Sequence, residues 1–366
     1  MNTTPLHAQH LALNAKMVDF FGWSMPLQYT SQMAEHRAVR THAGIFDVSH
    51  MVIVDVTGSD TIPFFRHLLA NDINKLKTPG QAIYSCMLNE QGNVIDDLIL
   101  YYLSQNHVRC IVNAACRDKD LPWMHTIAQS FNVNIELPDD LTIIALQGPK
   151  AREIAIDILP QPFNQQPPSL KPFRAFYDNN SLIARTGYTG EDGLEILLPS
   201  QQANQLWQDA IAANVTPCGL AARDTLRIEA GLNLYGQDMD EQVSPLISNL
   251  EWTLSFDDPA RDFIGKAALQ QQITAGLQQK LVGVVMTEAG VLRNQQTISF
   301  PNGTEGIITS GSFSPILNHA IGFARVPIDA PQQGTISQRK KQVPVQLTGL
   351  PFVRKGKVCQ SLQPVQ

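Results

Sequence analysis

The order in which hairpins and helices alternate constrains the fold of this chain more than any other feature. Residues 81–88 and 94–102 predict one hairpin, and a further strand and a helix over residues 118–131 follow it. Residues 178–180 are typical of a second hairpin turn. Because helices alternate with strands that also pair as hairpins, the pattern favours α+β modules over strict βαβ units.

The last third of the chain has a different character. A chain of 366 residues is longer than one hydrophobic core normally serves, so we expect two or three domains. The composition shifts near residue 242, and after a helix over residues 266–277 the tail is rich in strands and turns. Its expected strands are residues 280–286, 306–309, 320–326 and 342–347. They predict a small antiparallel barrel or sandwich.

Two adjacent carboxylates, Asp96 and Asp97, lie within the apolar strand that leaves the first hairpin. Asp is depleted in strands and costly to bury, so the pair needs a reason. Neighbouring side chains of a strand point to opposite faces, so Asp97 shares a face with Ile99 and Tyr101. Both faces are apolar, and the strand alone does not tell which Asp faces a site. A structural alternative stays open here, in which one Asp caps the turn and the other lies at a solvated strand end.

Charge and cysteine spacing argue against several classes of function. The net charge of −6 and the pI near 5.8 argue against nucleic-acid binding, and we interpret the short basic stretch at residues 339–341 as a solvated loop. Five scattered cysteines without C-x-x-C or Cys–His spacing predict neither disulfides nor a metal site. No apolar run approaches about 18 residues, and no signal peptide is apparent, so we expect a cytoplasmic protein without a membrane span. The glycine motifs of dinucleotide and P-loop sites are also missing from the sequence.

Two further stretches place polar residues next to glycine or proline. Residues 185–195 place Tyr188 and Glu195 among three glycines, with a hairpin loop of solvated acids as the alternative interpretation. Residues 349–355 present Arg354 after a proline, and ordinary surface exposure is its alternative. Each stretch is therefore a candidate for ligand binding.

Within residues 219–231, residues 222–230 predict a short helix that ends at Gly231 and has Arg223 at its start. A cation at that end opposes the helix macrodipole, which favours an anionic ligand as the partner of Arg223. Asp224 or Thr225 is expected to cap the helix.

Short motifs along nearly the whole chain resemble the glycine-cleavage-system T protein (aminomethyltransferase) family. Each motif alone is short, but their order and spacing are specific. The motifs are Met17-Val18-Asp19-Phe20, Phe46-Asp47-Val48-Ser49-His50-Met51, Ile95-Asp96-Asp97-Leu98, Arg185 to Glu195, Ala222-Arg223-Asp224, Tyr235-Gly236-Gln237-Asp238-Met239-Asp240 and Thr309-Ser310-Gly311-Ser312-Phe313-Ser314-Pro315.

The resemblance implies a ring of three domains with tetrahydrofolate in the central hole. Two α+β domains would be interleaved along the chain, the first from residues 1–50 and 141–241 and the second from residues 51–140. Residues 242–366 would form a linker helix and an antiparallel β-barrel-like domain. The implied reaction transfers the methylene of an aminomethyl-lipoyl H protein to tetrahydrofolate, releasing ammonia and forming 5,10-methylene-tetrahydrofolate. The lipoylated H protein is then the partner and tetrahydrofolate a co-substrate, without a metal, and the protein is expected to be a monomer.

The resemblance also assigns roles to residues. Asp97 would face the pterin, orient it, assist proton movement and stabilise developing positive charge. Glu195 would read the amino-pyrimidine edge, because a carboxylate accepts from two donors at once. Tyr84 is expected opposite Asp97 if the hairpin loop is residues 89–92. The residues expected around the folate are Met51, Tyr84, Tyr101, Tyr188, Glu195, Arg223 and Arg354, where Tyr101 would wall the ring and the arginines would bind the glutamate carboxylates.

Two positions depart from the family pattern, and a related function competes with catalysis. Ala221 and Val52 stand where the family commonly has glycine, and Ala221 would cost about 1 kcal/mol if that glycine had a positive φ. The competing function is that of a non-catalytic folate-binding relative that acts in iron–sulfur protein maturation. Those relatives carry a cysteine motif, and residues 231–237 lack the cysteine.

Overall fold

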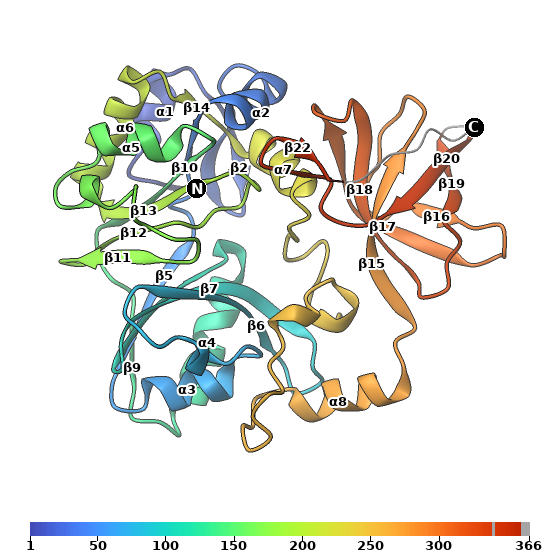
Figure 1. Ribbon diagram of the computed structural model, residues 1–366, viewed down its shortest axis with the longest axis horizontal. Helices are drawn as coiled ribbons and strands as arrows, with labels where there is room; N and C mark the ends of the chain where they lie inside the picture. Colours follow the sequence, from blue (N-terminus) through green and yellow to red (C-terminus); the bar gives the residue numbers. More distant parts are fainter. Residues whose placement is uncertain (339–340, 360–366) are drawn as a thin grey trace.

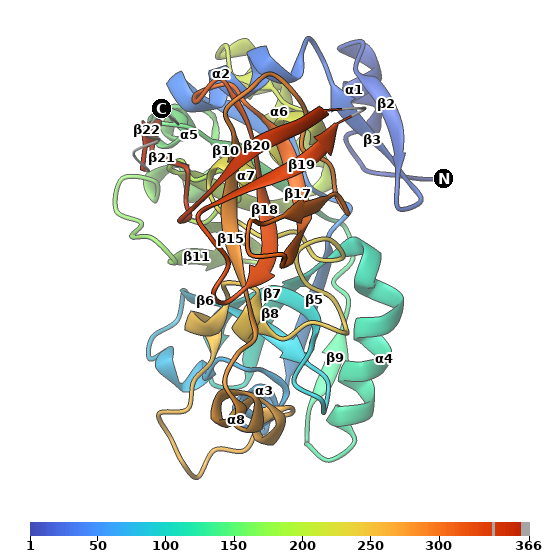
Figure 2. The same ribbon diagram turned by 90° about the vertical axis from the view of Figure 1, so that its right-hand side faces the viewer.

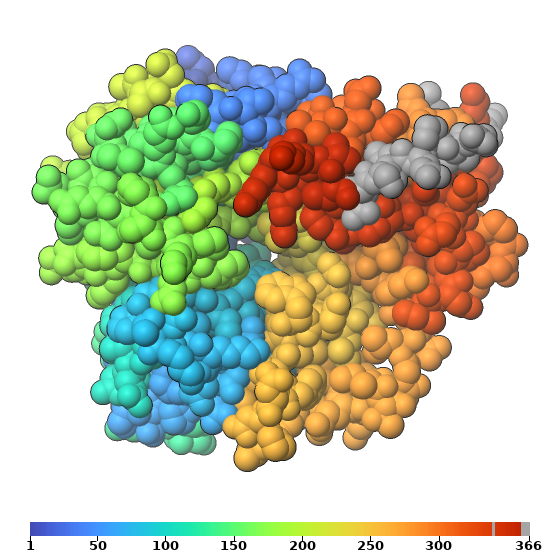
Figure 3. All heavy atoms as spheres, in the orientation of Figure 1, coloured from blue at the N-terminus to red at the C-terminus, as the bar shows by residue number. Residues whose placement is uncertain are grey.

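The computed structural model describes residues 1–338 and 341–359. It is a mixed α+β protein in which two sheet-based lobes and a barrel surround a central hollow (Figure 1; Figure 3). The basic stretch at residues 339–341 falls mostly outside the described residues, and Lys341, where the sequence favours a loop, begins a barrel strand. No helix within the described ranges is long and apolar enough to cross a membrane.

A six-stranded sheet in the order β11-β12-β13-β10-β4-β14 forms the core of the first lobe. Its strands are β4 (Gly44–Asp47), β10 (Leu141–Gln147), β11 (Ala175–Asp178), β12 (Ser181–Ala184), β13 (Gly193–Pro199) and β14 (Thr216–Pro217). The lobe also contains α1 (His7–Ala12), α2 (Gln32–Thr41), α5 (Ala151–Ile158), α6 (Ser200–Ala212), α7 (Leu220–Glu229) and a small sheet of β1 (Asn2–Thr3), β2 (Lys16–Phe20) and β3 (Trp23–Gln28). Trp207 on α6 is fully buried between these helices and the sheet.

A five-stranded sheet in the order β6-β7-β8-β5-β9 forms the second lobe. Its elements are β5 (Val52–Thr57), β6 (Gln81–Leu88), β7 (Val94–Ser104), β8 (His107–Val112), β9 (Asn134–Glu136), α3 (Thr61–Leu68) and α4 (Arg117–Ala128). One face packs on the two helices around Phe64 and Met124, and the other face, with Tyr101 and Ile111, packs against the six-stranded sheet. Since the second lobe is inserted between β4 and β10 of the first, the expected interleaved α+β fold is confirmed.

The last lobe is a closed six-stranded barrel, which confirms the antiparallel tail (Figure 2). Its strands are β15 (Gln279–Met286), β16 (Thr297–Ser299), β17 (Glu305–Ser314), β18 (His319–Pro327), β19 (Gln333–Gln338) and β20 (Lys341–Thr348), and α8 (Lys266–Ala275) precedes them. β15 pairs with both β18 and β20, which closes the barrel. A final hairpin of β21 (Val353–Arg354) and β22 (Lys357–Val358) returns to the first lobe, where the Lys355 amide donates to the Gly190 carbonyl. We propose that the domains begin and end near residues 51, 141 and 242.

The structure corrects the expected cap of α7. The helix begins at Leu220 after Gly219, so Asp224 and Thr225 lie inside it and neither caps it. Ala221 is therefore in the first helical turn, and Val52 is the first residue of a strand. Neither residue has a positive φ. The two departures from the family pattern therefore leave the local backbone unstrained.

Candidate functional site

A cavity of about 690 Å³ lies between the three lobes. Sites for small molecules and cofactors usually have volumes of about 300–1,000 Å³. Its wall includes seven of the eight residues expected at the site: Met51, Tyr84, Asp97, Tyr188, Glu195, Arg223 and Arg354. Arg354, in the final hairpin, is exposed at the cavity edge. The ring of lobes therefore brings together residues that are far apart in the sequence.

Tyr101 does not line the cavity. Its side chain is 1% exposed and packs between the two sheets. Its hydroxyl lies 3.2 Å from Oγ1 of Thr186, which donates a 2.6 Å hydrogen bond to Oε2 of Glu195. Four residues advance a strand by about 13 Å, so Tyr101 shares the face of Asp97 but lies beyond the cavity, beneath the six-stranded sheet. It supports Glu195 from behind.

Asp97 faces the cavity from the first half of β7, and both of its carboxylate oxygens accept hydrogen bonds. The Tyr84 hydroxyl donates to Oδ2 at 2.9 Å, and the Asn113 side-chain amide donates to Oδ1 at 3.0 Å. Burial, followed by the charge of neighbouring Asp96, raises the pKa of Asp97 to about 7. A carboxyl group with such a pKa can both hold and release a proton near neutral pH.

The register of the hairpin differs from the expected one. Asp97 lies opposite Cys86, and Tyr84 lies opposite Ile99. The cause is a loop that extends to Asn93 and a bulge beside Met87, which together shift the pairing by two positions. A shift of two keeps Tyr84 on the face of Asp97. Its side chain therefore reaches along the face to Asp97, as the 2.9 Å hydrogen bond shows.

Trp252 is a cavity residue that the sequence did not single out. It lies in a short 3-10 helix of the segment that connects the first lobe to the barrel along the chain. Its side chain is 58% exposed. Its ring stacks on Tyr84 with centroids 5.5 Å apart and planes 19° apart. An exposed tryptophan beside a cavity offers a flat apolar surface to a ring-shaped ligand. In the sequence it lies among apolar residues such as Leu250 and Leu254, so nothing local distinguishes it from a core residue.

Arg223 lies in the first turn of α7 with its guanidinium carbon 4.7 Å from the centre of the Tyr188 ring. The Tyr188 hydroxyl donates to the carbonyl of Asn233, which fixes this ring. The buried Nη1 of Arg223 has no hydrogen-bond partner among the described residues. Burial lowers the pKa of Arg223, but an arginine stays charged at neutral pH. A charged, buried donor without a partner is suited to an anionic group of a ligand.

His50 and Asn113 also belong to this wall, and their roles were not predicted. His50 is buried, and its Nδ1 has no hydrogen-bond partner within the described part of the chain. Burial and the charge of Arg223 lower the pKa of His50 to about 4, so the imidazole is neutral at pH 7. Asn113 follows strand β8 and donates to Asp96 as well as to Asp97. The neutral state of His50 and the hydrogen bonds of Asn113 both depend on residues that are distant in the sequence.

Comparison with known proteins assigns the family. Residues 6–258 match the family model described as the GCVT N-terminal domain, and residues 279–354 match the glycine cleavage T-protein C-terminal barrel domain. The chain belongs to the glycine cleavage T-protein family.

Solved structures agree with this family. The crystal structure of glycine cleavage system aminomethyltransferase T from Bartonella henselae is 32% identical in sequence and has a TM-score of 0.90, over 97% of this chain and 98% of that chain. A chain of heterotetrameric sarcosine oxidase from Corynebacterium sp. U-96 is 13% identical with a TM-score of 0.36, over 57% of this chain and 93% of that chain.

The cavity is formed where the two matched regions of the chain meet. Asp97, Glu195 and Arg223 lie in the first region, and Arg354 is the last residue of the barrel region. The site is therefore complete only when the barrel packs on the interleaved lobes.

Proposed function

We propose that this protein is the tetrahydrofolate-dependent aminomethyltransferase of a glycine cleavage system. It would transfer the methylene of an aminomethyl-lipoyl H protein to tetrahydrofolate, releasing ammonia and forming 5,10-methylene-tetrahydrofolate. The observation that carries the proposal is Asp97, a carboxyl group with a pKa of about 7 that faces a cavity of about 690 Å³. We further propose that the protein acts as a monomer in the cytoplasm, with the lipoylated H protein as a transient partner.

The cavity wall fits the parts of a reduced folate. Tyr84, Tyr188 and Trp252 offer aromatic surfaces for the pterin and benzoyl rings. Glu195 is held by Thr186 and retains acceptor capacity for an amino-pyrimidine edge, which presents hydrogen-bond donors.

Two arginines suit the glutamate carboxylates of the folate. Nη1 of Arg223 has no partner among the described residues, and Arg354 is exposed where the cavity opens. Arginine binds carboxylates with two parallel hydrogen bonds, so both guanidinium groups match this end of the ligand.

Asp97 is proposed to act on the proton and the charge of the reaction. In its ionised form it accepts a proton and stabilises positive charge that develops in the transition state. The hydrogen bonds from Tyr84 and Asn113 fix the carboxylate and so reduce the reorganisation that the reaction requires.

The test is product formation from defined components. The protein is incubated with aminomethyl-loaded H protein and tetrahydrofolate, and ammonia and 5,10-methylene-tetrahydrofolate are measured. We expect both products in equal amounts and only when all three components are present. Asp97→Asn should bind tetrahydrofolate and form little product, whereas Asp157→Asn, a change at an exposed position of α5, should leave turnover unchanged.

The alternative function makes a different prediction in the same experiment. A non-catalytic folate-binding relative would bind tetrahydrofolate in calorimetry but form neither ammonia nor methylene-folate. That combination of results, with folded protein and active H protein, would contradict the aminomethyltransferase proposal.

A further inference from the structure

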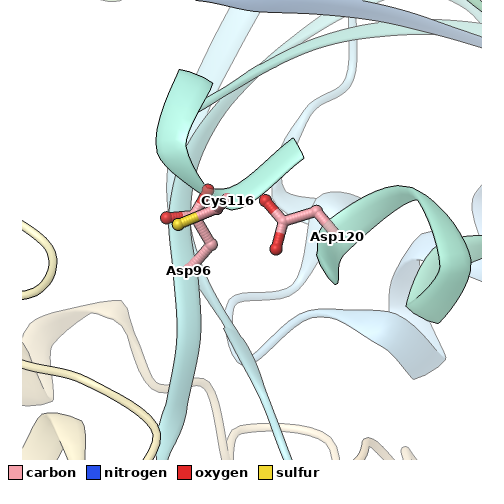
Figure 4. Close-up of side chains that lie close together, drawn as sticks. All are labelled: Asp96, Cys116 and Asp120. Atoms are coloured by element: carbon pink, nitrogen blue, oxygen red, sulfur yellow. The ribbon is translucent and has the colours of Figure 1, made fainter. Parts of the chain in front are cut away.

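A buried group of side chains lies behind the strand that carries Asp97. Asp96 points to the opposite face of β7, and Cys116 and Asp120 approach it from the start of α4 (Figure 4). Asp96 and Asp120 are fully buried and Cys116 is 3% exposed, and one oxygen of each carboxylate and the Cys116 sulfur lie within 4.8 Å of one another. None of the three belongs to the proposed folate contacts.

The hydrogen bonds of this group are unequally distributed. Asp96 accepts from the backbone amide of Asn113 at 3.0 Å and from its side-chain amide at 2.8 Å. Neither carboxylate oxygen of Asp120 has a hydrogen-bond partner within the described residues, and the Asp96 carboxylate lies within 4.8 Å of it. Lys119, the nearest cation in sequence, bonds the Tyr235 hydroxyl and pairs with Glu241 at 2.8 Å.

Two ionised carboxylates only accept hydrogen bonds, so a buried pair in contact repels unless one of them carries a proton. Asn113 donates twice to Asp96 and thereby favours its ionised form. The proton therefore belongs on Asp120.

We propose that Asp120 keeps its proton at neutral pH, donates it to Asp96, and so acts as a positioning residue for Asp97. Burial and the adjacent charge of Asp96 raise the pKa of Asp120 to about 10, in agreement with this arrangement. The thiol of Cys116 remains neutral as well, because burial and Asp96 raise its pKa. The group then holds a single negative charge, on Asp96.

Asn113 connects this pair to the cavity. Its side-chain nitrogen donates to Oδ1 of Asp96 and to Oδ1 of Asp97, so Asp96 orients the amide that orients Asp97. The charge of Asp96 also raises the pKa of Asp97. The titratable groups that face Asp97 or Asp120 from the packed elements are Tyr84, Cys86, Asp96, Cys110, Cys116, Lys119 and Tyr188. Of these, Lys119 alone is a cation, and it opposes the rise at Asp120.

The decisive measurement is a pH titration of the side-chain carboxyl carbons by ¹³C NMR in protein labelled at aspartate. The signals of Asp97 and Asp120 are assigned by their loss in Asp97→Asn and Asp120→Asn. We expect one carboxyl group to remain protonated at pH 8 in the wild type and its signal to vanish in Asp120→Asn. Asp157→Asn, the exposed control, should remove only its own signal.

Two variants then separate charge from shape. Asp96→Asn removes the charge behind Asp97 and should lower the pKa of Asp97 by about one unit or more. Asp120→Asn keeps a neutral donor toward Asp96 and should leave the pKa of Asp97 near its wild-type value. This contrast would place the negative charge on Asp96 and a neutral donor at position 120, because loss of a charge at Asp120 would lower the pKa of Asp97 as well.

Three results would overturn the proposal. One is a wild-type spectrum without a protonated carboxyl group at pH 8, and a second is an Asp120→Asn variant that lowers the pKa of Asp97 as much as Asp96→Asn. The third is a stoichiometric metal ion in the purified protein, measured by elemental analysis, that Asp120→Asn abolishes.

The inference rests on the proposed function only in giving Asp97 a catalytic role. Its NMR readouts need neither H protein nor turnover. A failed product assay with the expected titration would contradict the proposed function alone, and the reverse pair of results would contradict the role of Asp120 alone.

Discussion

Asp97→Asn should make the protein more stable at alkaline pH while it abolishes most turnover. The pKa of Asp97 is raised from 3.8 to about 7, chiefly by burial and then by Asp96. The folded state therefore favours the neutral form of Asp97. The contribution of this carboxyl group to the free energy of unfolding is fully present below pH 3.8 and is lost as the pH rises through 7. A difference of about three pKa units, at about 1.4 kcal/mol each, makes the full cost of ionised Asp97 about 4 kcal/mol.

Asparagine removes this cost but keeps the shape of the side chain. Its carbonyl oxygen can still accept from Tyr84, while its amide meets the amide of Asn113, and the loss of that hydrogen bond costs about 1 kcal/mol. We therefore expect a net gain of about 3 kcal/mol at about pH 8.5 and of less than about 1 kcal/mol at about pH 5, where folded Asp97 is mostly protonated.

Urea unfolding of wild type, Asp97→Asn and the exposed control Asp157→Asn at both pH values measures this difference. Tetrahydrofolate binding and product formation are measured on the same preparations. If Asp97→Asn is less stable than wild type at alkaline pH, or gains equally at both pH values, the buried charge is not the cause and the reasoning fails.

Three further changes test other parts of the molecule. Trp252→Ala removes the ring stacked on Tyr84, so tetrahydrofolate affinity in calorimetry should fall about tenfold, since such pairs contribute about 0.5–1.5 kcal/mol; unchanged affinity would show that the ring does not contact the ligand. Arg223→Lys keeps the charge but not the planar guanidinium, and calorimetry should show about tenfold weaker tetrahydrofolate binding, because bidentate recognition is lost; equal binding would mean that charge alone suffices. Arg227→Met leaves Asp238 buried without its 2.8 Å ion-pair partner, so the free energy of unfolding in urea should fall by about 3–5 kcal/mol; a loss below about 1 kcal/mol would contradict the role of this pair at the barrel interface.

Periodicity along single strands predicted a large part of this site. The alternation of side chains in β7 puts Asp97 and Ile99 on one face, and both line the cavity. The same rule gives the correct face for Tyr101 but not its surroundings, because the sequence does not reveal where the neighbouring lobe covers the strand. The bulge beside Met87 is equally invisible, since turn residues permit several loop lengths.

The remaining parts depend on contacts between distant residues. The antiparallel tail follows from its strand pattern, but closure requires β15 to pair with β20, about 60 residues later, and no local pattern distinguishes a barrel from a sandwich. His50, Asn113 and Trp252 gain their roles from neighbours in other elements. Among the sequence features, only the order of the family motifs indicated that the three lobes share one site.

Three acids without an ion pair in the described part of the chain lie on both faces of β7, at one wall of the cavity and directly behind it. Elsewhere, every buried acid among the described residues has a nearby compensating partner: Asp47 with His10, Asp55 with Arg109, Asp72 with Arg66, Glu229 with His36 and Arg40, Asp238 with Arg227, and Glu35 with three backbone amides. Asp96, Asp97 and Asp120 have no ion pair within the same described residues. Asn113 donates to Asp96 and Asp97, Tyr84 donates to Asp97, and Asp120 lies beside Asp96. A buried acid without a compensating partner costs stability, so such acids are rare in packed interiors. Acids with shifted pKa values cluster at functional sites, where proton transfer uses them. The three acids without an ion pair are therefore Asp97, to which the proposed function assigns the reaction chemistry, and its two neighbours.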